Sequence, residues 1–61
     1  MHRYLLTFRL VYPDGYRCTV TEGITGLDTL AQAVAFARNL LRDDGASVAT
    51  LLDWSRCPDF G

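Results

Sequence analysis

The chain has no lysine, a single histidine, two cysteines and two prolines among its 61 residues. One histidine and two distant cysteines, Cys18 and Cys57, do not give the ligand spacing of a metal site, so we expect neither a metal nor another cofactor. Two cysteines also make no disulfide framework, and Met1 leads into an alternating pattern rather than the apolar segment of a secretory signal. We therefore predict free thiols in a cytoplasmic protein.

Long apolar runs are absent as well. The longest are far too short to cross a bilayer, which argues against a membrane protein. Six arginines stand against seven acidic residues, and the net charge is −1. This balance gives no sequence-independent attraction to the phosphates of nucleic acids.

The residue types that carry catalysis are scarce. His2 lies next to the terminus, and no carboxylate is placed to orient it as a general base. Cys18 falls inside a predicted strand, where burial makes a thiol inert. A chain this short also lacks the concave pocket that a substrate needs. We predict that the protein is not an enzyme and has no small-molecule substrate.

The strongest pattern that is present indicates a β-hairpin. Residues 3–12 alternate with period two, which is typical of a strand with one buried face. Its apolar and aromatic positions are Tyr4, Leu6, Phe8, Leu10 and Tyr12. Residues 13–15, Pro-Asp-Gly, fit a three-residue hairpin loop with a left-handed glycine. A second strand over residues 16–22 then pairs with the first and places Leu10 opposite Cys18.

A helix is predicted over residues 28–43, after a loop over residues 22–26 that contains two glycines. Its N-cap is either Asp28, or Thr25 with Asp28 three residues later, and Gly45 is the expected stop. The stripe with 3.6-residue period that faces the sheet consists of Leu27, Leu30, Ala33, Val34, Ala37, Leu40 and Leu41.

The third strand is predicted over residues 46–55, with a tail over residues 56–61. Its even-numbered positions are predicted on the core side, which makes Trp54 mostly core and places Leu51 on the other side. Phe36 and Phe60 are either packed at the sheet edge or interface anchors, since aromatic side chains dominate binding energy when exposed.

Together these elements predict one α+β domain over residues 1–61, with a two-layer ββαβ fold. The three-stranded antiparallel sheet has the order 2-1-3, and a right-handed crossover places the helix on one face. The other face stays open to solvent unless a partner covers it.

The open sheet face is the candidate binding surface, weighed against an ordinary solvated sheet. The residues predicted on it are Arg3, Leu5, Thr7, Arg9, Val11, Arg17, Thr19, Thr21, Leu51 and Asp53. The partner-binding residues that we predict are Arg9, Arg17, Leu5 and Val11 on the sheet, and Asp43 and Asp44 at the end of the helix. RNA recognition needs aromatic side chains for base stacking, and the aromatic residues here point to the core instead.

The segments Pro13–Tyr16, Gly26–Leu30 and Ala33–Arg38 resemble the antitoxins of HicA–HicB systems, which have a "DGY" strand followed by a "G-D-T-L-E-E-A" helix start. This resemblance implies a homodimeric regulatory protein with a partial RNase-H-like sheet, although the acidic pair of that helix start does not occur in this chain. In size and lack of motifs the chain is also similar to small phage or mobile-element inhibitors of the anti-CRISPR kind, which cover a surface of a larger host complex.

Three functions follow as hypotheses. The first is a non-enzymatic protein-binding module, an inhibitor that sterically blocks a larger protein or ribonucleoprotein complex in the cytoplasm of a bacterial host. The second is a regulatory homodimer formed by pairing edge strands or stacking open faces. The third is a weak nucleic-acid binder that uses the arginines of the sheet face.

Overall fold

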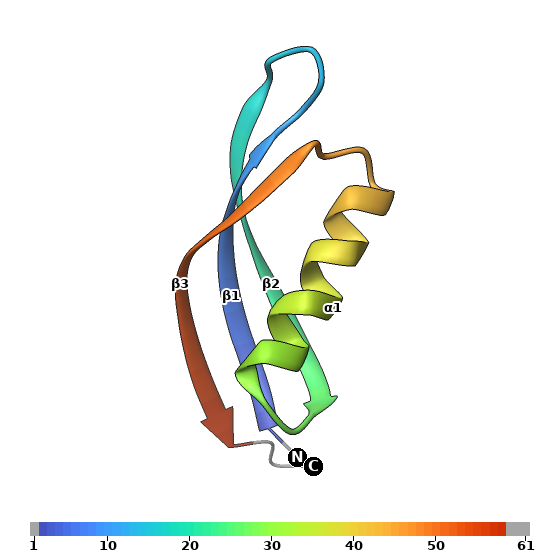
Figure 1. Ribbon diagram of the computed structural model, residues 1–61. Coiled ribbons are helices and arrows are strands. Elements are labelled where there is room, and N and C mark those ends of the chain that lie inside the picture. The colour runs from blue at the N-terminus through green and yellow to red at the C-terminus, as the bar shows by residue number, and fades with distance from the viewer. Residues whose placement is uncertain (1, 59–61) are drawn as a thin grey trace.

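The computed structural model describes residues 2–58, with the side chains of residues 3–57. Its elements are β1 (His2–Val11), β2 (Arg17–Leu27), α1 (Leu30–Asp43) and β3 (Val48–Pro58). The strands form an antiparallel sheet in the order β2-β1-β3, and α1 lies across one face of it (Figure 1). The predicted α+β fold and its strand order are therefore confirmed. The path from β2 through α1 to β3 is right-handed (Figure 1).

The β1–β2 hairpin has the predicted register, with Leu10 opposite Cys18. Gly15 in the turn has a φ of +89°, a conformation that glycine adopts without strain. The carboxylate of Asp14 accepts a hydrogen bond of 2.9 Å from the N–H of Tyr16. The turn residues therefore fix the pairing of the two strands locally.

β2 is longer than predicted, because residues 22–26 are strand and not loop. Gly23 pairs with β1, and a side chain at this position would be in ordinary van der Waals contact with Leu5. Ile24 is buried opposite Tyr4 and holds this half of β2 against the core. The prediction of a loop was wrong because this pairing and burial outweigh the low strand propensity of glycine.

α1 begins at Leu30 with Thr29 as its N-cap, so the predicted caps, Asp28 and Thr25, were wrong. Thr29 Oγ1 accepts a hydrogen bond of 3.2 Å from the N–H of Gln32. The side-chain oxygen of Gln32 in turn accepts one of 3.2 Å from the N–H of Asp28. The arrangement is close to a capping box, for which Thr29 and Gln32 have the required spacing.

The C-terminal end of α1 is a Schellman motif. The N–H of Gly45 donates to the carbonyl of Arg42 at 3.0 Å, and the N–H of Ala46 donates to the carbonyl of Leu41 at 3.1 Å. Gly45 has a φ of +110°, which confirms it as the stop. Leu41 and Ala46 are both buried and provide the apolar contact that accompanies this motif.

β3 contains a β-bulge that the sequence pattern does not reveal. The Cα partners pass from Thr7–Asp53 directly to Phe8–Leu51, so Leu52 has no partner on β1. One extra residue reverses the alternation of faces along the strand. On the helix side, β3 therefore presents odd-numbered residues before the bulge and even-numbered residues after it.

For the residues of β3 before the bulge, the prediction of which side chains face the core was wrong. Leu51 packs against the core instead of lying on the open face, whereas Val48 and Leu52 are about half exposed. Trp54 lies on the helix side, opposite Leu6. It is nevertheless 49% exposed, because β3 is an edge strand, so the prediction that it is mostly core was also wrong.

The tail begins later than predicted, because residues 56–58 still pair with β1. The rest of the predicted tail, including Asp59 and Phe60, lies outside the described residues, as does the side chain of His2.

The core lies between α1 and the sheet. Its central strand contributes Leu6, Phe8 and Leu10, which have almost no exposed surface, and the helix contributes Ala33, Ala37 and Leu41. Small alanine side chains at two of these helix positions let the helix backbone approach the sheet closely. Within residues 2–58, α1 has neither the length nor the apolar character required to cross a membrane.

Candidate functional site

The face of the sheet opposite α1 carries four of the six predicted partner-binding residues. We call it the open face. The register places on it Arg3, Leu5, Thr7, Arg9, Val11, Arg17, Thr19, Thr21, Gly23, Thr25, Val48, Thr50, Asp53, Ser55 and Cys57. Arg9 and Arg17 are exposed and line one shallow depression, while Leu5 and Val11 are half-buried. The structure therefore gathers these four residues on a single surface.

The charges of the open face are predominantly positive. Three arginines, Arg3, Arg9 and Arg17, lie on it with one acidic residue, Asp53. No carboxylate of the described residues forms an ion pair with any of the three arginines. Three positive charges against one negative charge give +2 for this face, so a net charge of −1 for the chain leaves −3 for the remainder. The open face is thus net positive, whereas the rest of the chain is net negative.

Between the arginines the open face is rich in threonine. Thr7 and Thr21 lie opposite each other, and their hydroxyl oxygens are 3.2 Å apart. Each hydroxyl can both donate and accept a hydrogen bond. The face is therefore polar and adaptable at its centre, with apolar side chains such as Leu5 and Val11 toward its two ends.

Asp43 and Asp44, the other two predicted partner-binding residues, lie apart from this surface. They end α1, where Asp44 is the C-cap, and both side chains are exposed. Because α1 covers the opposite face of the sheet, the two aspartates and the arginine group belong to different sides of the molecule. One flat partner surface cannot contact both groups.

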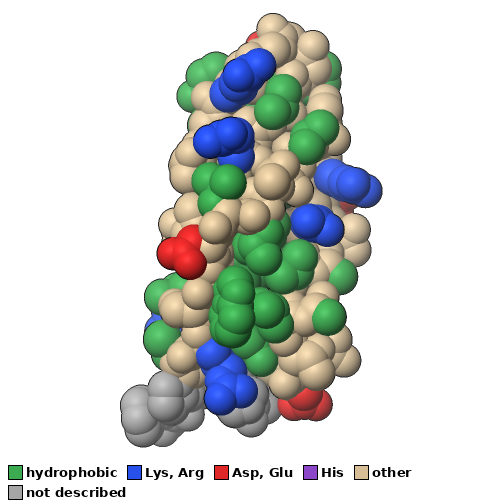
Figure 2. Space-filling model, turned by 60° about the vertical axis from the view of Figure 1, so that its left-hand side comes forward, with side chains coloured by type: hydrophobic (Ala, Val, Ile, Leu, Met, Phe, Trp, Pro, Cys, Tyr) green, Lys and Arg blue, Asp and Glu red, His purple; other side chains and the backbone are tan. Residues whose placement is uncertain are grey.

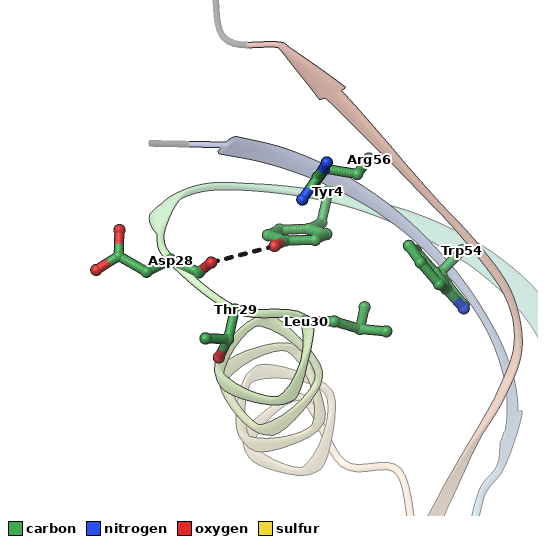
Figure 3. Close-up of a pocket in the computed structure, with 6 residues that line it drawn as sticks. All are labelled: Tyr4, Asp28, Thr29, Leu30, Trp54 and Arg56. Carbon is green, nitrogen blue, oxygen red and sulfur yellow. Dashed lines mark hydrogen bonds between the residues drawn. The ribbon is translucent and has the colours of Figure 1, made fainter.

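A groove of about 620 Å³ lies between the start of α1 and β3. Its lining residues, shown in Figure 3, are Tyr4, Asp28, Thr29, Leu30, Trp54 and Arg56. The hydroxyl of Tyr4 donates a hydrogen bond of 3.4 Å to the Asp28 carbonyl, and the side chain of Leu30 points toward Trp54. Figure 2 brings the β3 side of the molecule forward and shows hydrophobic side chains gathered in the lower half of the view. This groove was not predicted from the sequence, because Trp54 was expected mostly in the core and the helix was expected to begin before Leu30.

The tip of the hairpin presents two aromatic rings. Tyr12 and Tyr16 have ring centroids 5.8 Å apart with an interplanar angle of 44°, and Tyr16 is 61% exposed. Partial desolvation raises the pKa of Tyr12 above its ordinary value, and the charges of Cys18, Asp44 and Tyr16 act in the same direction. Tyr12 therefore keeps its proton to a higher pH than a free tyrosine does.

The two thiols are both free and half-buried. Cys18 belongs to the helix side of β2 and Cys57 to the open side of β3, so the central strand separates them. Cys18, which was predicted to be buried, is only half-buried because β2 is an edge strand. Among residues 2–58 no three histidine, cysteine or acidic side chains come together in a way that could hold a metal ion.

Comparison with known proteins yields no relative for this chain: it matches no family model, no curated protein and no solved structure at a significant level.

Proposed function

We propose that the chain is a non-enzymatic protein-binding module whose open face covers an acidic surface of a larger partner. The observation that supports this is the uncovered sheet face on which Arg3, Arg9 and Arg17 have no acidic partner among the residues that the structure describes. Arginine is enriched in protein interfaces and among the residues that contribute most of the binding energy. Leu5 and Val11 are half-buried on the same face and add apolar contact area beside the arginines. Carboxylates of the partner would satisfy the guanidinium groups, in part through bidentate hydrogen bonds.

The mode of action that we propose is steric. A rigid sheet with α1 packed behind it presents its open face without rearrangement, and covering a functional surface of a larger protein or ribonucleoprotein complex is sufficient for inhibition. A cytoplasmic location and an origin in a phage or mobile element belong to the same proposal and rest on the chain's size and composition.

Charge reversal on the two sides of the molecule tests the proposal. The variant Arg9→Glu/Arg17→Glu changes the open face, and Arg38→Glu/Arg42→Glu makes the same change of charge on exposed positions of α1. In affinity capture from host lysate, we expect the first variant to retain about tenfold less partner than the wild type, equivalent to about 1.4 kcal/mol. The second variant should retain the wild-type amount. Equal retention by both variants would refute the use of the open face.

Nucleic acid is the second candidate partner, favoured by the net positive charge of the open face. The absence of aromatic side chains from this face counts against base stacking. Gel retardation with single-stranded and duplex DNA and RNA at low ionic strength separates the two proposals. A salt-sensitive shift that Arg9→Glu/Arg17→Glu abolishes would favour nucleic acid over an acidic protein.

A further inference from the structure

α1 carries an exposed apolar ridge that the core does not use. Phe36 and Leu40 are 50% and 46% exposed, so the prediction that Leu40 faces the sheet was wrong. The two residues stand one turn apart, and their side chains are neighbours on the helix surface. The other large exposed hydrophobic residues lie on the hairpin or on β3 and are Tyr16, Val48, Leu52 and Trp54. The ridge is therefore the one place on α1, within the described residues, where two such side chains adjoin.

The ridge lies on the β2 side of the helix. At 100° per residue, Phe36 and Leu40 fall on one flank of the buried positions Ala33, Ala37 and Leu41. In a right-handed crossover from β2 through α1 to β3 (Figure 1), this flank turns toward β2. The opposite flank turns toward β3.

β2 offers an unprotected edge beside this ridge. Residues 17–25 pair with β1 on one side in a continuous register, without proline or bulge, and β2 is an outer strand of the sheet. The other outer strand, β3, is interrupted by the bulge at Leu52 and ends in Pro58, two features that oppose further pairing. On the helix side of β2, Cys18 and Val20 are only half-buried. The β2 edge is therefore the better template for another strand.

We propose that β2 pairs antiparallel with β2 of a second copy, which gives a six-stranded sheet in which the two ridges face each other. A two-fold axis through Thr21 fits the structure best. α1 starts beside Tyr4 and ends beside Tyr12, so its middle, with Phe36, lies level with the Thr7–Thr21 pair. The axis therefore brings Phe36 against Phe36 of the partner copy.

The dimensions of the pairing agree with this packing. Three strand spacings of about 4.8 Å separate the two central strands, so helices above them are about 14 Å apart. Directly packed helices stand about 8–10 Å apart. The helices of the two copies would therefore stand about 4–6 Å farther apart than directly packed helices. Large side chains can fill this gap, whereas alanine is too small. Phe36 and Leu40 are the large residues on this flank, and they would fill it from both sides.

The charges at the edge permit the pairing without opposing like charges. With Thr21 on the axis, Arg17 stands opposite Thr25 of the partner copy and Glu22 opposite Val20 of the partner copy. Glu22 is the one charged side chain on the helix side of β2, and pairing partly desolvates it. Removing its charge should therefore strengthen the dimer.

The dimer concerns a surface different from the open face. Because the two-fold axis is perpendicular to the sheet, both helices lie on one side and both open faces on the other. The pairing thus doubles the open face and leaves its arginines accessible. A failure of the dimer and a failure of partner capture are accordingly separate results.

Light scattering coupled to size-exclusion chromatography at about 100 µM tests the proposal. We expect the wild type to have about twice the monomer mass of 6.8 kDa, and Phe36→Glu/Leu40→Glu to be monomeric. Leu52→Glu is the matched control, because Leu52 has similar exposure on the opposite edge, and it should remain dimeric. Glu22→Gln should lower the dimer dissociation constant several-fold.

A monomeric wild type at this concentration would overturn the proposal, as would a dimer that survives Phe36→Glu/Leu40→Glu but is lost in Leu52→Glu. Amide hydrogen exchange of the wild type gives a readout without substitutions. We expect the outward-facing amides of residues 17–25 to become protected as concentration rises, while those of the β3 edge do not. Protection confined to β3 would also overturn the proposal.

Discussion

Leu5 and Leu6 are adjacent on the central strand and point to opposite faces, so truncating each to alanine compares the two faces directly. Leu6 is completely buried under α1, whereas Leu5 is half-buried on the open face. Leu6→Ala removes about three buried carbon groups, each worth about 0.8 kcal/mol, and leaves a cavity. The expected loss in free energy of unfolding is about 2–5 kcal/mol.

That loss is large for a chain of 61 residues, whose whole stability is roughly 3–9 kcal/mol. Because each kcal/mol shifts the midpoint of a small domain by about 4–8 °C, a loss near 3 kcal/mol lowers the Tm by about 12–24 °C. Leu5→Ala removes the same atoms from a position that water already reaches, so we expect about 1 kcal/mol and about 4–8 °C.

Thermal unfolding followed by circular dichroism measures both variants, with protein concentration held fixed because association would shift the midpoint. Equal shifts for the two variants would contradict the difference in burial between Leu5 and Leu6. They would mean that the face carrying Leu5 is as deeply buried in solution as the face under α1.

Three further predictions concern the ends of the elements. Gly45→Ala should destabilise the chain by about 1–3 kcal/mol in urea unfolding, because a φ of +110° strains an alanine. Gly23→Ala should be close to neutral, since a Cβ at this position would make only ordinary van der Waals contacts. Thr29→Ala should cost about 1 kcal/mol in the same assay through loss of the hydrogen bond to Gln32. The raised pKa of Tyr12 means that the folded state holds this proton more tightly than the unfolded state does. Its contribution to stability is complete below about pH 10 and is lost as the pH rises through the folded-state pKa. Tyr12→Phe should therefore lose less stability than the wild type as the pH rises above about 10.

Each of these has a result that would contradict it. Equal effects of alanine at Gly45 and Gly23 would show that the helix end does not need a left-handed residue. Thr29→Ser should keep the N-cap hydrogen bond and most of the stability. If Thr29→Ser lost as much stability as Thr29→Ala, the hydrogen bond would not be the cause of the loss. Parallel pH profiles for wild type and Tyr12→Phe would show that Tyr12 does not contribute to the alkaline loss.

The hairpin could be predicted from the sequence because its determinants are local. Alternation over β1 and the Pro-Asp-Gly turn fix the register within a few residues, and Gly45 fixes the helix end. The helix start was misplaced although Thr29 and Gln32 have capping-box spacing, because Thr25 and Asp28 have the same spacing with an acidic residue. In the structure Thr25 and Leu27 still pair with β1, so the helix begins only after β2 has ended.

The bulge in β3 could not be predicted because no residue type marks it. Leu51 and Leu52 are identical side chains, and either can face the core until the pairing with Phe8 and Thr7 is known. Its location decides that Leu51 is core and that Trp54 lines the groove beside α1. The candidate arginines of the open face were placed correctly because they lie on the hairpin, whose phase is independent of β3.

Arginine modification with a dicarbonyl reagent tests directly whether the open face binds the partner. The modification is quantified by mass spectrometry for the free protein and for the purified complex with its captured partner. We expect Arg9 and Arg17 to be modified in the free protein and protected in the complex, while Arg38 and Arg42 on α1 react equally in both. Protection of the helix arginines with unchanged reaction of Arg9 and Arg17 would contradict this expectation, because the partner would then cover the helix and not the open face.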